Sequence, residues 1–254
     1  MSTLTAASTA PSQPPPAGPG VLTLRVLGTG LAVLLVAGAT LGVVAGFFRQ
    51  SRTETQVYAG VTALSVSAST GSVTIQAGTP GGPVTVTRHL SWSFGTATSA
   101  ETLRTGRLDV RADCGGNLGL GLCTVSYDVV VPPDLPLTIE THTGTVEVVG
   151  VTGDVSATTH TGSVELRDLR SRRVQASTST GSVAVAFATA PDDVRADTST
   201  GSVEVVVPAG PTTYAVAAST STGSTDVAVP VDPASGHRIS AHTSTGSVEV
   251  RTAP

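Results

Sequence analysis

From residue 137 to the end of the chain, apolar and polar positions alternate with a period of two on both sides of a recurring Thr-Gly pair. A period of two is typical of a β-strand, whose successive side chains point to opposite faces. Val203 and Glu204, for example, fall in neighbouring columns and are expected to point inward and outward, respectively. Helical spacing fits nowhere in this region. The pattern predicts two short, half-buried strands per unit, separated by a turn at the glycine.

This unit is a sequence repeat with the motif T-G-[ST]-V-x-V, whose last valine is replaced by Ile75 and Leu166 in two copies, and with one variant, TGSTDV. Its turn glycines are Gly71, Gly144, Gly162, Gly181, Gly201, Gly223 and Gly246. From Gly144 onward they are 18 to 23 residues apart, so the loops vary in length while the motif is constant. A unit of this size cannot bury its apolar face alone, and stacking of copies is the usual solution.

We therefore predict an all-β fold, a β-solenoid (β-helix-like) of about 20-residue repeats with six coils in residues 137–254. Neighbouring coils would lie about 4.8 Å apart. Threonine columns one and three positions before each glycine would form hydroxyl ladders along the stack. A stack of antiparallel hairpins that forms a sandwich is the alternative.

Residues 57–136 are predicted to form an N-terminal β region that holds the first repeat and further strands, with a turn between Cys114 and Cys123. We expect these two cysteines to close a hairpin by a disulfide, which would stabilise the fold by about 2.5–3 kcal/mol. A disulfide indicates an oxidising, exported compartment.

The N-terminal part of the chain is predicted to anchor it in a membrane. Residues 1–25 read as a disordered, Pro-rich tail, and residues 26–48 form an uncharged apolar stretch. As a helix this stretch would span roughly 34 Å, enough for a hydrocarbon core of about 30 Å. A cleaved signal peptide is the alternative, although its apolar region is usually shorter. Residues 49–56 are expected to be a linker.

The orientation of this transmembrane helix follows from the cysteines. One Arg before the span and two after it slightly oppose a cytoplasmic N-terminus, but the disulfide favours a cytoplasmic tail and an extracytoplasmic C-terminal domain. The expected location is thus a single-pass protein of the cell membrane. Gly38, Gly42 and Gly46 lie on one face of the helix and would let two helices approach closely.

Composition narrows the possible functions. Aromatic residues are 3% and charged residues 13% of the chain, its 14 basic residues are all arginines, and the net charge is −4. A basic patch for nucleic acid is therefore not expected. Neither a G-x-S-x-G elbow nor a nucleotide-binding glycine pattern occurs, so we expect no enzyme activity and no cofactor.

Two columns of the repeat carry candidate chemistry. His142 and His160 each stand two residues before a turn glycine, so stacked coils would place them about 5 Å apart, near Glu140, as a surface site for Zn²⁺ or Cu²⁺. Two solvated imidazoles are the alternative. An acidic ladder lies three residues after the glycines: Glu147, Glu165, Glu204, Asp226 and Glu249. It could bind Ca²⁺ or a polycation, or simply keep the surface soluble.

The repeated T-[ST]-T-G-S-V-x-V units, preceded by a segment ending V-S-Y-D-V-V-V-P, resemble a bacterial family of membrane-anchored β-strand-repeat proteins of unknown function, labelled "putative adhesin". The resemblance covers residues 57–250 and implies an exported β-solenoid that faces the cell envelope, without catalytic residues. The outward Ser/Thr columns and the acidic ladder suggest a binding or adhesion module that presents a polar Ser/Thr and acidic face to wall polymer or protein. A self-assembling structural or envelope-stress-sensing protein, joined through its solenoid ends, is the alternative. The Ala-, Val-, Thr- and Gly-rich composition further suggests an actinobacterial source.

Overall fold

The computed structural model describes residues 50–93, 96–115 and 122–253, and every regular element in these residues is a β-strand. No helix able to span a membrane occurs among them. The predicted span at 26–48 and its glycines lie outside the described residues.

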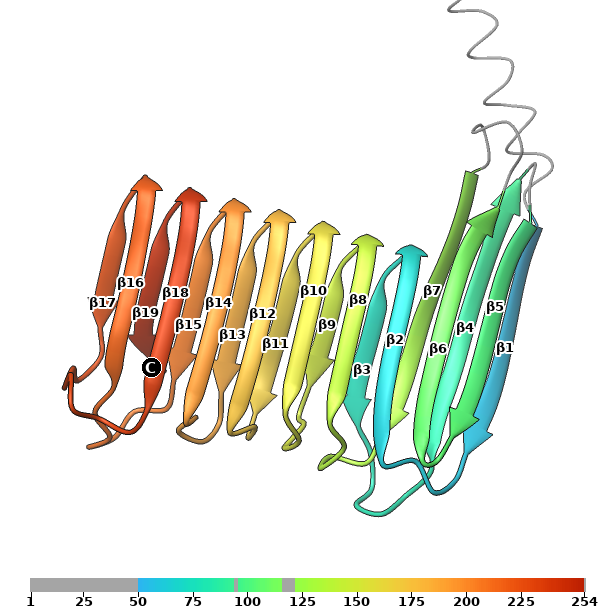
Figure 1. The fold of residues 1–254 in the computed structure, drawn as a ribbon, viewed down its shortest axis with the longest axis horizontal. Helices are drawn as coiled ribbons and strands as arrows, with labels where there is room; N and C mark the ends of the chain where they lie inside the picture. The colour runs from blue at the N-terminus through green and yellow to red at the C-terminus, as the bar shows by residue number, and fades with distance from the viewer. Residues whose placement is uncertain (1–49, 94–95, 116–121, 254) are drawn as a thin grey trace, which may run out of the picture. The chain divides into compact units, whose positions relative to one another are not determined.

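The strands form two sheets (Figure 1). Across sheet A the order is β1 (Gln50–Tyr58), β4 (Val84–Ser93), β7 (Leu122–Val131), β3 (Val73–Ala77), β9 (Val146–Val149), β11 (Val164–Leu169), β13 (Val183–Phe187), β15 (Val203–Val207), β19 (Val248–Thr252) and β17 (Thr225–Ala228). Across sheet B the order is β16 (Ala215–Thr222), β18 (Arg238–Thr245), β14 (Asp193–Thr200), β12 (Arg173–Thr180), β10 (Val155–Thr161), β8 (Leu137–Thr143), β2 (Ala63–Thr70), β6 (Arg107–Gly115) and β5 (Thr96–Arg104).

Each repeat contributes one strand to each sheet, and equivalent strands of neighbouring repeats pair in parallel. Val155 of β10, for example, lies opposite both Leu137 of β8 and Val174 of β12. Parallel pairing makes each repeat one coil of a solenoid-like stack and excludes the antiparallel-hairpin alternative.

The core lies between the sheets and follows the predicted parity. One inward row of sheet A runs Glu54, Arg88, Tyr127, Val73, Val146, Val164, Val183, Val203, Val248 and Thr225. The interior of this row is apolar, with Val203 only 1% exposed, whereas both ends are polar. The inward side chains are therefore apolar in the middle of the stack and polar at its two ends.

The inward threonines correct the predicted hydroxyl ladder. The threonines three residues before the glycine are buried, except Thr220 in the terminal coil, and each hydroxyl donates to a glycine carbonyl in the neighbouring coil: Thr198 Oγ1 to Gly181 O at 2.9 Å is one case. The column one residue before the glycine, which includes Thr180, is exposed instead. A buried hydroxyl must find a partner, and the turn carbonyl is within reach.

The turn glycines are required by two independent features. Gly181 has a φ of 139°, which L side chains rarely adopt, and a Cβ on it would lie 2.0 Å from the carbonyl oxygen of Gly162. The turns of neighbouring coils stack closely on one another, and only glycine can occupy this position in each turn.

At its C-terminal end the stack departs from chain order. The last repeat, β18 and β19, lies between β14 and β15 on one side and β16 and β17 on the other (Figure 1). The terminal coil is therefore residues 215–228, with the variant motif TGSTDV, and not the last repeat, as expected from sequence.

Two predictions for the N-terminal region were wrong. Residues 50–58 form β1, an edge strand antiparallel to β4, where a linker was expected up to residue 56. Cys114 and Cys123 do form a disulfide, with Cα atoms 5.7 Å apart, but they do not close a hairpin. Cys114 lies on β6 of sheet B and Cys123 on β7 of sheet A, so the bond links the two sheets.

Candidate functional site

The outer face of sheet B presents parallel columns of small polar side chains. One column, ordered from β6 to β16, is Asp113, Ser69, His142, His160, Ser179, Ser199, Ser244 and Ser221. Because the strands pair in register, neighbouring side chains of this column are separated by the distance between adjacent strands, about 4.8 Å. Such a face is a regular, rigid array of hydrogen-bonding groups.

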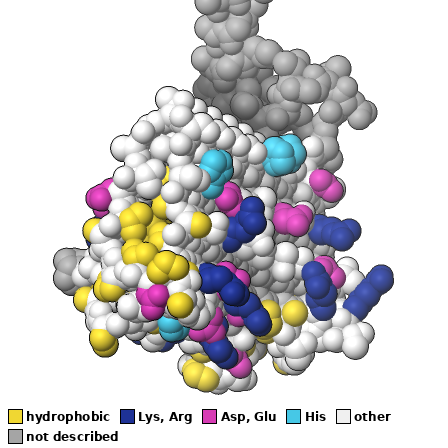
Figure 2. All heavy atoms as spheres, turned by 60° about the vertical axis from the view of Figure 1, so that its left-hand side comes forward, with side chains coloured by type: hydrophobic (Ala, Val, Ile, Leu, Met, Phe, Trp, Pro, Cys, Tyr) yellow, Lys and Arg dark blue, Asp and Glu magenta, His cyan; other side chains and the backbone are white. Residues whose placement is uncertain are grey.

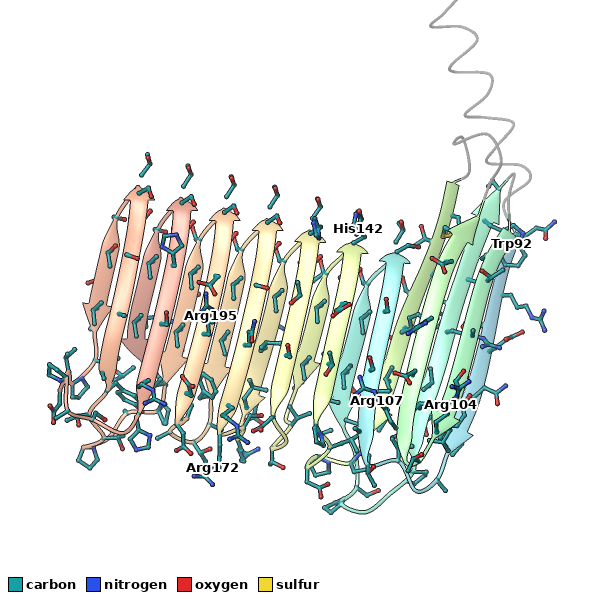
Figure 3. All side chains as sticks on the ribbon, viewed as in Figure 1. Trp92, Arg104, Arg107, His142, Arg172 and Arg195 are labelled. Carbon is teal, nitrogen blue, oxygen red and sulfur yellow. A yellow bond between two sulfur atoms is a disulfide. The ribbon has the colours of Figure 1, made fainter. Side chains whose placement is uncertain are left out.

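The structure brings His142 and His160 together. Thr141 lies opposite Thr159 and Thr143 opposite Thr161, which aligns the two histidines on β8 and β10. Their rings are stacked, with centroids 4.6 Å apart and an interplanar angle of 14°. Both side chains are exposed, and His142 projects near the C-terminal end of β8 (Figure 3).

A shallow depression of about 380 Å³ lies beside this pair. It is lined by Ser67 and Ser69 of β2, by Arg111 and Asp113 of β6 and by Glu140 and His142 of β8. Sequence analysis missed Arg111 and Asp113, because only the topology places inserted strand β6 beside β2. The depression forms because the short serine side chains of β2 lie between the longer polar side chains of β6 and β8.

A second depression, of about 500 Å³, lies where the strands of sheet B begin. Thr138, Gln175 and Arg195 contribute to its lining. Arg173 also borders it and donates to Asp154 at 2.7 Å, a hydrogen bond that raises the pKa of Arg173. Sheet B thus carries polar depressions near both ends of its strands.

The acidic ladder lies on the other sheet, and arginines form ion pairs with four of its five members. Glu147 and Glu165 are neighbours on sheet A, and Arg167 donates to both of them. Glu204 and Glu249 are likewise neighbours, and Arg251 makes ion pairs with both of them. Ala184 separates the two pairs, and the swap of the last two repeats moves Asp226 from the middle of the ladder to the terminal coil. The Ser/Thr columns and the acidic ladder therefore lie on opposite sheets, not on the one surface expected from sequence.

Residues 134–253 match the family model Toastrack DUF4097. The repeat region is similar to this Toastrack family. The resemblance drawn from the Thr-Gly repeats is thereby confirmed for this part of the chain, and we refer to residues 134–253 as the Toastrack region.

Two solved structures are similar to this chain. One is described as a "putative cell adhesion protein" from Clostridium sporogenes ATCC 15579, with 8% identity and a TM-score of 0.43 over 80% of this chain and 100% of the other. The second is described as a "putative adhesin" from Bacteroides fragilis NCTC 9343, with 12% identity and a TM-score of 0.36 over 80% of this chain and 97% of the other. No curated protein matches the chain in sequence.

N-terminal to the Toastrack region, a network of charged side chains fills the space between the sheets. Arg88 of β4 donates to Glu54 of β1 and to Glu101 and Ser99 of β5, and Tyr58 donates to Glu101. Sequence analysis missed this network, although Arg88 follows Val84 and Val86 in an inward column.

The network shifts several pKa values. The hydrogen bond from Arg88 holds the pKa of Glu54 below its usual range. Burial, together with the hydrogen bond to Glu101, raises the pKa of Tyr58 to about 12. Burial also raises the pKa of Tyr127, whose hydroxyl lies 3.0 Å from Ser99 Oγ.

Among residues 50–93, 96–115 and 122–253, no three His, Cys, Asp or Glu side chains are grouped so that they could hold a metal ion. A metal at the histidine pair would therefore have two protein ligands from the described part of the chain. Water would occupy its other coordination positions.

Proposed function

We propose that this protein is a non-enzymatic binding module of the cell envelope whose contact surface is the outer face of sheet B. The observation that carries this proposal is the regular array of hydroxyl-bearing side chains on that face, interrupted by two polar depressions. Hydroxyl groups both donate and accept hydrogen bonds, which suits an extended polar polymer or polypeptide of the cell wall. The acidic residues of sheet A are a poorer candidate surface because arginines already pair with most of them.

Co-sedimentation of the full-length, detergent-solubilised protein with isolated cell-wall material tests this proposal. Ser179→Arg places a bulky charge on the outer face of sheet B and should reduce the bound fraction. Ala184→Arg makes the matched change on sheet A and should leave it unchanged. Equal binding by the two variants and the parent would show that the outer face of sheet B is not the contact surface.

The proposal includes a membrane anchor at 26–48 and an extracytoplasmic location for the strands. The disulfide between Cys114 and Cys123 supports an oxidising compartment. Protease added to intact, wall-stripped cells should remove the repeats. Full protection would contradict this orientation.

A second candidate function is self-assembly, which the exposed terminal coil favours. β16 and β17 are both edge strands, Val227 is 37% exposed, and Val216 and Ala218 are only partly buried. Figure 2 shows hydrophobic side chains gathered on this end of the stack. Edge strands with exposed apolar side chains invite pairing with a second copy. Sedimentation velocity over a range of concentrations should then show oligomers that Val227→Lys dissociates, while a monomer at all concentrations would exclude this function.

A further inference from the structure

We infer that His142 and His160 form a binding site for one divalent transition-metal ion, with Cu²⁺ held more tightly than Zn²⁺ or Ni²⁺. This inference does not rest on the proposed binding of envelope material. It rests on the position of the two imidazoles, on their free ring nitrogens and on the charges around them.

The backbone sets the separation of the two rings. β8 and β10 are central strands of sheet B and pair in register on either side of both histidines, so the 4.6 Å between the ring centroids matches the spacing of adjacent strands. Metal–imidazole bonds are about 2.0–2.1 Å long, so the two nitrogens bound to one ion lie roughly 3–4 Å apart. Rotation of two exposed, adjacent rings about their terminal torsions brings their nitrogens to that separation without moving the strands.

The ring nitrogens of this pair have no protein partner among the described residues, and in this the pair differs from the other histidines. His89 contacts Thr53 and Asp128, His237 contacts the carbonyl of Pro191, and His242 contacts Ser219. The nitrogens of His142 and His160 therefore remain available as ligands.

Position in the repeat also singles out the pair. Five other coils carry serine in this column, at Ser69, Ser179, Ser199, Ser221 and Ser244. Serine is thus compatible with the fold at this position, and no buried contact requires an imidazole there. His142 and His160 therefore place two imidazole nitrogens, which are strong metal ligands, at positions where the other coils have serine hydroxyls, which are weak ligands.

Nearby charges favour a cation at the pair. The adjoining depression contains Asp113, Glu140 and Arg111, a net excess of one negative charge. Glu140 is two residues before His142 and lies on the same face of β8, where its carboxylate can accept hydrogen bonds from metal-bound water.

The donor type selects the ion. Imidazole suits Cu²⁺, Ni²⁺ and Zn²⁺, with Cu²⁺ the strongest in the Irving–Williams order. Ca²⁺ and Mg²⁺ require oxygen ligands and should not bind here.

Titration of metal-free, full-length protein in detergent with CuCl₂, followed by electron paramagnetic resonance, tests the inference. One Cu²⁺ per chain with the hyperfine pattern of two imidazole nitrogens is expected. His142→Ser and His160→Ser should each weaken binding by about 10-fold or more and leave a single imidazole in the spectrum. His242→Ser, which removes a lone histidine from the same sheet, is the matched control and should change neither affinity nor spectrum.

Thermal unfolding of the apo-proteins separates loss of the site from loss of the fold, since the serine variants should unfold at the temperature of the parent. Tight Cu²⁺ binding that survives the double variant His142→Ser/His160→Ser would place the ion elsewhere and overturn the inference. Absence of Cu²⁺ binding by the parent at pH 7.5 would also overturn it.

Discussion

Arg88 donates a hydrogen bond from Nη1 to Oε1 of Glu101 at 2.9 Å, and this pair joins sheet A to sheet B near the N-terminal end of the stack. The side chains are 16% and 5% exposed, respectively. The end of a solenoid would expose its apolar core to water if the inward residues there were also apolar. At this end the inward positions that hold valine in the repeats are occupied by charged side chains that are hydrogen-bonded to one another. The opposite end has no comparable network among the described residues, and its terminal coil exposes Val227.

Removal of Arg88 should destabilise the protein strongly. Arg88→Met leaves the buried carboxylate of Glu101 without a cation, and breaking a buried ion pair in this way costs up to about 3–5 kcal/mol. Urea unfolding measures the loss. The control is Arg104→Met, at an exposed position of the same region, which should cost within about 0.5 kcal/mol. Equal costs for the two variants would show that the network contributes nothing.

Stability should fall in alkali because folding keeps the tyrosines neutral. Burial raises the pKa of Tyr58 to about 12 and also raises those of Tyr127 and Tyr214, whereas a tyrosine in the unfolded chain titrates near 10. The folded state is therefore fully favoured below pH 10 and loses stability as the pH rises toward 12. Absorbance at 295 nm and circular dichroism should show tyrosinate forming together with unfolding. Tyrosinate formation by all three residues near pH 10 with the fold intact would contradict this.

The inward and outward columns can be tested at Val203 and Glu204. Val203→Asp puts an unpaired charge into the core and should cost several kcal/mol. Glu204→Ser removes an exposed ion pair with Arg251 and should cost at most about 1 kcal/mol. Hydrogen exchange on Val203→Asp should show β13, β15 and β19 opening first, while β4 and β7 stay protected. A greater loss from the Glu204 variant would invalidate the parity assignment.

The stacked turns should tolerate only glycine at the turn positions. Gly181→Ala forces an L residue into a φ of 139° and a Cβ against Gly162, so it should cost at least about 1–3 kcal/mol. Gly210→Ala is the control, because a Cβ there meets no atom within 4 Å. Thermal unfolding should separate the two variants clearly, and comparable melting temperatures would argue against the stacked-turn explanation.

The inter-sheet disulfide should contribute about 2.5–3 kcal/mol under oxidising conditions, as expected from its short loop. Cys114→Ser should lower the melting temperature in oxidising buffer and change it little in reductant. A variant as stable as the parent under both conditions would leave the bond without a stabilising role.

The pattern of residues along the chain is sufficient to predict which side chains of each repeat are buried and which coils are similar. Period-two alternation is a local property, so the inward position of Val203 and the adjacency of His142 and His160 followed from aligning the Thr-Gly pairs. The buried threonine hydroxyls were assigned to the wrong partner, because their acceptor is a backbone carbonyl in another coil. Column patterns identify a side chain's face but not its hydrogen-bond partner.

The order of the strands at the ends of the stack could not be predicted from the residue pattern and became clear from the three-dimensional fold. Parallel repeats with nearly identical faces can pair with any similar neighbour, so the pattern alone does not place β18 between β14 and β16 or Asp226 at the terminal coil. The variant Thr225, in a column otherwise filled by valine, was the one local signal of that end. The pairing of Arg88 with Glu101 likewise depends on β4 and β5 entering different sheets. Contacts of this kind depend on the path of the chain through space, which a local alternation of apolar and polar residues does not specify.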